Sequence, residues 1–177
     1  MKFELCAAGF GGQGVMAIGQ LISYAAVEEN RFALFLPSYG PEMRGGTANC
    51  ICIVSDQQIG SPIVPKNESA IVMNTPSFFK FEPTIEKNGC LLVNSALINE
   101  KTARTDIEAH YIPANHIAAE AGNKIVANIV MLGALLKLKN FAKTETIQKV
   151  IKEKFGSKGS KIVDMNMKAL QMGFDSV

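Results

Sequence analysis

The chain has 177 residues, of which 47% are hydrophobic and 19% are charged. This length and composition predict a single folded domain over residues 1–177 and exclude a disordered chain. Lysine and arginine number 18 against 16 aspartate and glutamate, so the formal net charge is only +2. Without a basic block, the sequence gives little support for nucleic acid as a partner.

The sequence also argues against a membrane protein. Its start, MKFELCAAGF, runs directly into a glycine-rich segment and lacks the long apolar core and cleavage site of a signal peptide. The most apolar stretch, residues 126–136, is too short to span a bilayer and is followed by Lys137 and Lys139. We therefore expect a cytoplasmic protein without a membrane partner.

The first third of the chain alternates strand and helix patterns. A buried strand is expected at residues 3–8, and a helix at 12–28 whose apolar residues recur at helical spacing. Further strands are expected at 32–36 and 47–54. Between them, residues 37–46 (PSYGPEMRGG) hold two prolines and three glycines, which predicts a shaped loop rather than a regular element.

The middle third continues with short apolar runs. A strand is expected at residues 70–74, followed by a helix that reaches Lys87 and ends at Gly89, because glycine commonly terminates helices. Two more strands are expected at 90–94 and 109–112.

The last third has the periodicity of helices. They are expected at residues 117–121 and 126–139, then around residues 147–155, and finally at 163–174. The whole pattern predicts one α/β domain with a central mixed or mostly parallel sheet covered by helices. Its first strand, loop and helix should be Rossmann-like.

The first loop satisfies the pattern G-x-G-x-x-G between a strand and a helix. Its candidate cofactor-binding residues are Gly11, Gly12, Gln13 and Gly14. Glycines at this place allow a tight turn, and the helix N-terminus offers N–H groups to a phosphate. A dinucleotide site usually also needs a carboxylate at the end of the second strand, but that strand ends Phe35-Leu36-Pro37-Ser38. One alternative is that the glycines serve only the packing of the strand against the helix. We favour a role of the loop in contacting a phosphate or a partner within a larger assembly.

No other group of residues supports independent chemistry. Cys6, Cys50, Cys52 and Cys90 lie in apolar, strand-like runs without a CxxC pair, which is typical of buried structural thiols. His110 and His116 have neither the spacing nor the neighbours of metal ligands. The sequence therefore predicts no catalytic residue, no metal site and no cofactor bound by this chain alone.

Two loops taken together carry a family resemblance. Residues 9–15 (GFGGQGV) followed by residues 38–49 (SYGPEMRGGTAN) resemble the gamma subunit of 2-oxoacid:ferredoxin oxidoreductases. The likeness continues through residues 122–128 (GNKIVAN) and into the last helix, so it covers nearly the whole chain.

The resemblance implies a role in the oxidative decarboxylation of a 2-oxoacid with coenzyme A to an acyl-CoA, carbon dioxide and reduced ferredoxin. It places thiamine diphosphate and iron–sulfur clusters in partner subunits. The implied partners are alpha and beta subunits, with a delta subunit as a further candidate, and ferredoxin through the complex. Residues 38–64 slightly favour a branched-chain or pyruvate-type enzyme. A stand-alone nucleotide-binding module and an indolepyruvate oxidoreductase subunit stay alternatives.

The resemblance also points to a second set of site residues, at a partner contact or the edge of the active site. In that set, the planar guanidinium of Arg44 can donate two hydrogen bonds to a carboxylate or phosphate. Local pairing of Arg44 with Glu42 is the alternative. Asn128 lies in an apolar helix, where it either faces a subunit junction or makes a core hydrogen bond to a neighbouring strand. The full set is Tyr39, Gly40, Pro41, Glu42, Arg44, Gly45, Gly46 and Asn128.

Overall fold

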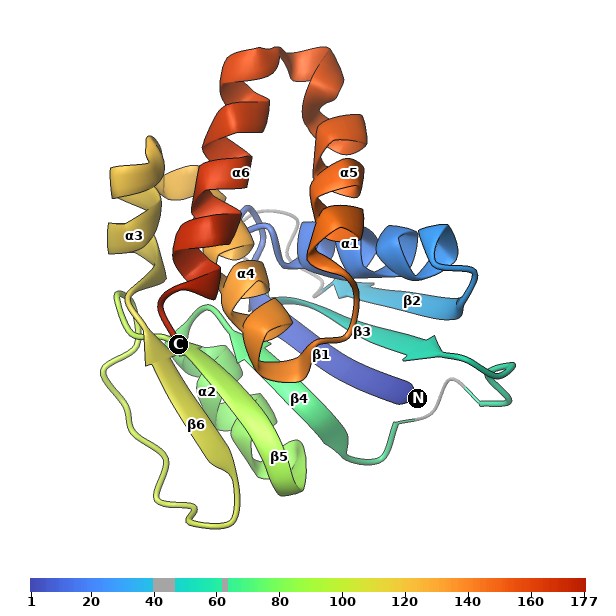
Figure 1. The fold of residues 1–177 in the computed structure, drawn as a ribbon. Coiled ribbons are helices and arrows are strands. Elements are labelled where there is room, and N and C mark those ends of the chain that lie inside the picture. Colours follow the sequence, from blue (N-terminus) through green and yellow to red (C-terminus); the bar gives the residue numbers. More distant parts are fainter. Residues whose placement is uncertain (40–46, 62–63) are drawn as a thin grey trace.

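A computed structural model describes residues 1–39, 47–61 and 64–177 and shows a six-stranded sheet with helices on both faces (Figure 1). The strands are β1 (Lys2–Phe10), β2 (Phe32–Tyr39), β3 (Thr47–Ser55), β4 (Asn67–Val72), β5 (Ile85–Asn94) and β6 (Glu108–Ile112). The α-helices are α1 (Val15–Glu28), α2 (Thr75–Phe81), α3 (Ala114–Ala121), α4 (Ala127–Lys139), α5 (Thr144–Phe155) and α6 (Ser160–Phe174). Short 3-10 turns are η1 (Glu82–Thr84), η2 (Lys124–Val126) and η3 (Gly156–Lys158).

The strand order is β2-β3-β1-β4-β5-β6. Strands β1, β4, β5 and β6 pair in parallel, whereas β3 is antiparallel to both β1 and β2. The sheet is therefore mixed but mostly parallel, and the predicted α/β class is confirmed. From β1 the chain crosses to β2 at one edge, and from β4 it continues toward the other edge. The sheet thus has a topological switch point between β1 and β4, where ligands of open α/β sheets commonly bind.

Alternate residues of the strands supply two apolar layers. One face, with Leu5 and Leu92, is covered by α1 and α4, on which α3, α5 and α6 pack, while the other, with Cys6 and Leu91, is covered by α2 (Figure 1). Helix α4 is the centre of the thicker layer, because all of residues 127–136 are buried. Even so, no helix within the described residues is long and apolar enough to cross a membrane.

The helix predicted after residue 74 is present, but its predicted extension to Lys87 and its end at Gly89 are wrong. Helix α2 ends at Phe81, η1 follows, and β5 begins at Ile85, so Gly89 lies inside a strand rather than after a helix. The pairing of β5 with β4 is irregular there, and Asn88 has a positive φ of 65°. Pairing of β5 with β4 overrides the helical pattern of the local sequence. Position 89 requires glycine because a Cβ there would lie 2.8 Å from the carbonyl oxygen of Glu68.

Two other predicted boundaries also change. Helix α1 begins at Val15 rather than Gly12, because Gly14 occupies the left-handed N-cap position. Residues 37–39 belong to β2 and not to the predicted loop. Strand β2 is at the sheet edge, where a proline such as Pro37 is tolerated. The rest of that predicted loop, residues 40–46, lies outside the described residues.

Candidate functional site at the glycine loop

The glycine loop lies at the carboxyl end of β1, beside the switch point of the sheet. Gly12 and Gly14 have φ angles of 97° and 75°, in the left-handed region that side chains disfavour. Gly14 is the N-cap of α1 and offers no side chain to the first N–H groups of that helix. These groups are therefore available to an anion, and the helix dipole favours negative charge there.

Gln13 fixes the shape of the loop. Its Oε1 accepts a hydrogen bond from the backbone N–H of Phe10 at 2.7 Å, and its Nε2 donates to the carbonyl of Met73 at 3.0 Å. The side-chain amide thus ties the loop to the end of β1 through Oε1 and to the residue after β4 through Nε2. The expected contact between Gln13 and a cofactor stays a prediction.

Asn128 of α4 supports the same loop from the other side. Its Nδ2 donates to the carbonyl of Gly14 at 3.2 Å, and only 6% of the residue is exposed. A Cβ on Gly14 would lie 2.5 Å from that nitrogen, so the two residues fit only if position 14 is glycine. Of the two alternatives for Asn128, a core hydrogen bond is present, but it goes to the glycine loop rather than to a neighbouring strand, and a contact at a subunit junction stays a prediction.

Two hollows flank the loop and share Gly12 and Ile125. The larger, of about 510 Å³, lies against Gly14, Asn128, Phe155, Lys158 and Asn166. The smaller, of about 230 Å³, lies against Gln13, Met73, Asn115 and Lys124, at the switch point. Neither hollow is lined by a described aspartate or glutamate.

The positive charge of these hollows suits an anionic ligand. Lys124 and Lys158 make no ion pair with any described residue. Asn128 and Asn166 already donate from Nδ2 to backbone carbonyls, so the lysines rather than these amides are the side chains suited to an anion.

The structure brings part of the predicted site together. Gly11, Gly12, Gln13 and Gly14 lie beside Asn128 at this edge. Tyr39 is at the same edge, because it pairs with Ala48, which in turn pairs with Gly9, and 71% of it is exposed. The other predicted residues, Gly40, Pro41, Glu42, Arg44, Gly45 and Gly46, lie outside the described residues.

Sequence reasoning did not identify Asn115, Lys124, Ile125 and Lys158 as site residues. They come from α3, η2 and η3, far from the loop in sequence. Only the run at residues 122–128, already part of the family resemblance, pointed toward this region. Lys158 carries no sequence signal, because it reaches the loop only through the packing of α5 and α6.

The cysteines do not fit a metal cluster. All four are buried, and burial raises the pKa of Cys6 and Cys50 to about 12 and that of Cys52 and Cys90 to about 11. Cys50 and Cys52 instead contact backbone carbonyls of α1. Among the described residues, no group of three or more His, Cys, Asp or Glu could hold a metal ion.

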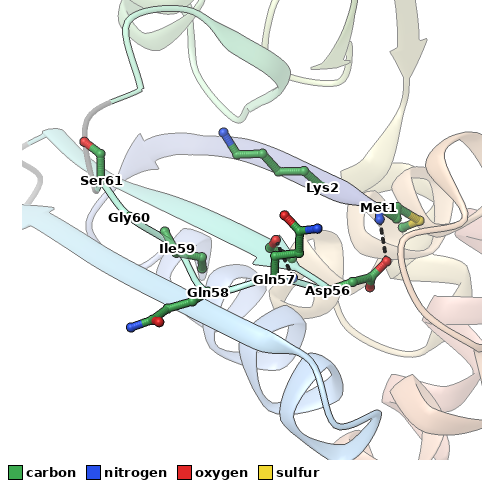
Figure 2. Close-up of a pocket in the computed structure, with 9 residues that line it drawn as sticks. Met1, Lys2, Asp56, Gln57, Gln58, Ile59, Gly60 and Ser61 are labelled. Atoms are coloured by element: carbon green, nitrogen blue, oxygen red, sulfur yellow. Dashed lines mark hydrogen bonds and ion pairs between the residues drawn. The ribbon is translucent and has the colours of Figure 1, made fainter.

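Another hollow, of about 590 Å³, lies at the opposite end of β1 (Figure 2). It is lined by Met1, Lys2 and residues 55–61, and Asp56 forms an ion pair with the amino group of Met1 there. It is remote from the glycine loop because β1 runs the length of the sheet between them. None of the predicted site residues lines it.

Comparison with known proteins assigns this chain to a family. Residues 4–176 match the family described as pyruvate ferredoxin/flavodoxin oxidoreductase. The chain is 36% identical to the ketoisovalerate oxidoreductase subunit VorA of Methanothermobacter marburgensis, over 95% of this chain and 35% of that protein. It is 34% identical to the 2-oxoglutarate synthase subunit KorC of Methanocaldococcus jannaschii, over 99% and 94% of the two chains.

A solved structure agrees with these relatives. The keto/oxoacid ferredoxin oxidoreductase gamma subunit of Geobacter sulfurreducens superposes with a TM-score of 0.82 at 30% identity, over 98% of this chain and 97% of that one. The chain spans about a third of VorA but nearly the full length of KorC and of the Geobacter subunit. The chain therefore belongs to the pyruvate ferredoxin/flavodoxin oxidoreductase family, as a gamma-type subunit of 2-oxoacid:ferredoxin oxidoreductases.

Proposed function

We propose that this chain completes a complex that oxidatively decarboxylates a 2-oxoacid with coenzyme A, and that its glycine-loop edge contacts coenzyme A. The products are an acyl-CoA, carbon dioxide and reduced ferredoxin. The observation that carries the contact is the pair of hollows beside the α1 N-terminus, with Lys124 and Lys158 and no described carboxylate. Coenzyme A carries phosphates, and a helix N-terminus with nearby lysines is suited to hold them.

In this proposal the chain binds and orients rather than reacts. Gln13 and Asn128 hold the loop so that the free N–H groups of α1 face the ligand, and Lys158 of the larger hollow neutralises part of its charge. Thiamine diphosphate and the iron–sulfur clusters belong to the partner subunits and supply the carbanion and electron-transfer chemistry. The proposed partners are alpha and beta subunits, with delta as a further candidate, and ferredoxin through the complex, in the cytoplasm.

The proposal also concerns which 2-oxoacid is the substrate. The two relatives carry different names, ketoisovalerate and 2-oxoglutarate, at nearly equal identity. We favour a branched-chain or pyruvate-type acid, as residues 38–64 suggest. An indolepyruvate enzyme is the alternative within the same chemistry.

A stand-alone dinucleotide-binding module is the second candidate, and the glycine loop favours it. The sheet topology argues against it. Antiparallel β3 lies between β1 and β2, so the end of β2 is two strands away from the loop, and its last residues, Pro37-Ser38-Tyr39, include no carboxylate for a ribose.

The test is anaerobic affinity purification of the tagged chain from its native cells. Recovered partners are identified, and coenzyme A-dependent ferredoxin reduction is assayed with pyruvate, 2-oxoisovalerate, 2-oxoglutarate and indolepyruvate. We expect thiamine- and cluster-bearing partners and activity on one of these acids. Recovery of a lone chain that binds NAD, NADP or FAD with saturation contradicts the proposal and supports the second candidate.

A further inference from the structure

The turn that joins α3 to α4 presents an apolar side chain to solvent. Ile125 of η2 is 70% exposed, while the next residue, Val126, is buried. Lys124, directly before it, is also exposed and has no ion pair with a described residue. An exposed isoleucine beside an unpaired cation is a small apolar anchor with a charged neighbour.

This turn is rigid rather than loose. The N–H groups of Gly122 and Asn123 both donate to the carbonyl of Ala118 at 3.1 Å, and Gly122 has a φ of 137° that favours glycine. The side chain of Asn123 then caps η2 by accepting from the N–H of Ile125 at 3.0 Å. Since the backbone is already fixed, a partner that binds Ile125 loses little entropy in ordering it.

The turn also stands at the rim of the ligand site. Ile125 lines both hollows, and Lys124 lines the smaller one. Both hollows are open, so the described chain supplies only part of a wall around any ligand. Tyr39, which is also exposed, ends β2 at the same end of the sheet as the glycine loop.

We propose that residues 123–125 dock into another subunit of the same oxidoreductase, with Ile125 in an apolar pocket and Lys124 against a carboxylate. This inference rests on the proposed function, because the partner is a subunit of that complex. The carboxylate follows from charge complementarity: the rim offers lysines and no acid. Docking there also closes the hollows, which the chain alone leaves open.

The occupant is another part of the enzyme rather than a second copy of this chain. In the Methanothermobacter relative the matched region is 35% of the polypeptide, so this domain exists there with further chain attached. A second copy would bring the same lysine-bearing, carboxylate-free rim and place like charges opposite each other.

Val27 and Phe79 serve as controls because they are exposed to a similar extent, 62% and 61%, and lie on α1 and α2. The tagged chain, as wild type, Ile125→Asp, Lys124→Glu, Val27→Asp or Phe79→Asp, is co-expressed with the subunits recovered by the anaerobic purification. Partner recovery is measured together with the thermal midpoint and molar mass of each isolated chain. Ile125→Asp should reduce partner affinity at least about tenfold, with an unchanged midpoint. The control variants should bind like the wild type.

Three outcomes overturn the inference. Ile125→Asp and Lys124→Glu binding like the wild type would place the interface elsewhere, and loss of partner with Val27→Asp or Phe79→Asp alone would place it on that helix. If Ile125→Asp dissociates a homodimer and leaves partner recovery unchanged, the molecule that binds at residues 123–125 is a second copy of this chain. A wild-type chain that recovers no partner is a different result, because it contradicts the proposed function itself.

Discussion

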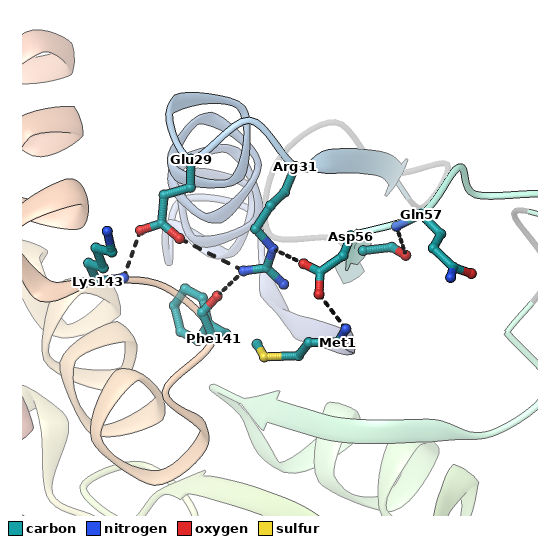
Figure 3. Close-up of polar contacts among 8 residues, drawn as sticks. Met1, Glu29, Arg31, Asp56, Gln57, Phe141 and Lys143 are labelled. Atoms are coloured by element: carbon teal, nitrogen blue, oxygen red, sulfur yellow. Dashed lines mark hydrogen bonds and ion pairs between the residues drawn. The ribbon is translucent and has the colours of Figure 1, made fainter.

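Arg31 donates a hydrogen bond from Nη1 to the backbone carbonyl of Phe141 at 2.6 Å, across 110 residues of sequence (Figure 3). The same guanidinium donates from Nε to Asp56 at 2.9 Å. Nearby, Glu29 accepts the N–H of Lys143 at 2.7 Å. The start of β2, the end of β3 and the connection from α4 to α5 are therefore joined at one point.

Arg31→Ala should lower the free energy of unfolding by about 2 kcal/mol, because it leaves the Phe141 carbonyl without its charged donor. The Arg31 side chain is only 12% exposed, so solvent replaces the donor poorly, whereas the half-exposed Asp56 loses little. Urea unfolding with an unchanged m-value measures the effect. Lys66→Ala, at an exposed position, is the control, and an equal loss in both variants would show that the junction contributes nothing.

Asp106 should make the stability dependent on pH. Hydrogen bonding to Arg104 at 2.8 and 2.9 Å lowers the pKa of Asp106 below its ordinary 3.8. A carboxylate with a lower pKa in the folded state stabilises the fold above about pH 4, and this contribution is lost as the pH falls through the lowered value. Asp106→Asn should therefore be less stable than the wild type at pH 7, with the difference shrinking toward pH 3 in urea unfolding. A difference independent of pH would contradict this origin.

These contacts show where sequence reasoning succeeds and where it stops. The glycine loop, α1 and the apolar strands follow from local spacing, and the structure confirms them. The strand at residues 85–94 was partly missed because its form depends on pairing with β4 and on Asn88 in a left-handed conformation. Likewise, Lys158 reaches the glycine loop only through the α5–α6 hairpin, and no local pattern encodes that approach.

Helices α4 and α6 cross with their backbones in contact at two glycines. A Cβ on Gly133 would lie 2.1 Å from the carbonyl oxygen of Leu170, and one on Gly173 would lie 2.0 Å from that of Val130. Gly133→Ala or Gly173→Ala should each destabilise the fold by about 3 kcal/mol, because backbone atoms must separate. Gly156→Ala is the matched control: its φ and ψ are helical and its Cβ meets nothing within 4 Å, so it should be neutral or stabilising in the same unfolding assay.

The cysteines should be unreactive in the folded protein. With thiol pKa values of about 11 to 12 and buried sulfur atoms, almost no thiolate is present or accessible at pH 8. A chromogenic disulfide reagent should label the native chain no faster than it unfolds, and label all four cysteines at once in guanidinium chloride. Rapid labelling of the native chain would show an opening of the sheet that this packing does not predict.

Gly12→Ala and Gly14→Ala should separate backbone strain from steric fit at the proposed coenzyme A site. Both have positive φ, so each alanine should cost about 1 kcal/mol of stability. Only Gly14→Ala also clashes with Asn128, whereas a Cβ on Gly12 meets nothing within 4 Å. Gly14→Ala should therefore raise the KM for coenzyme A in the assembled enzyme, and Asn128→Ala should partly relieve the stability loss when combined with it. Additive losses in the double variant, measured by urea unfolding, would mean that the two side chains do not compete for space and that the loop relaxes by another route.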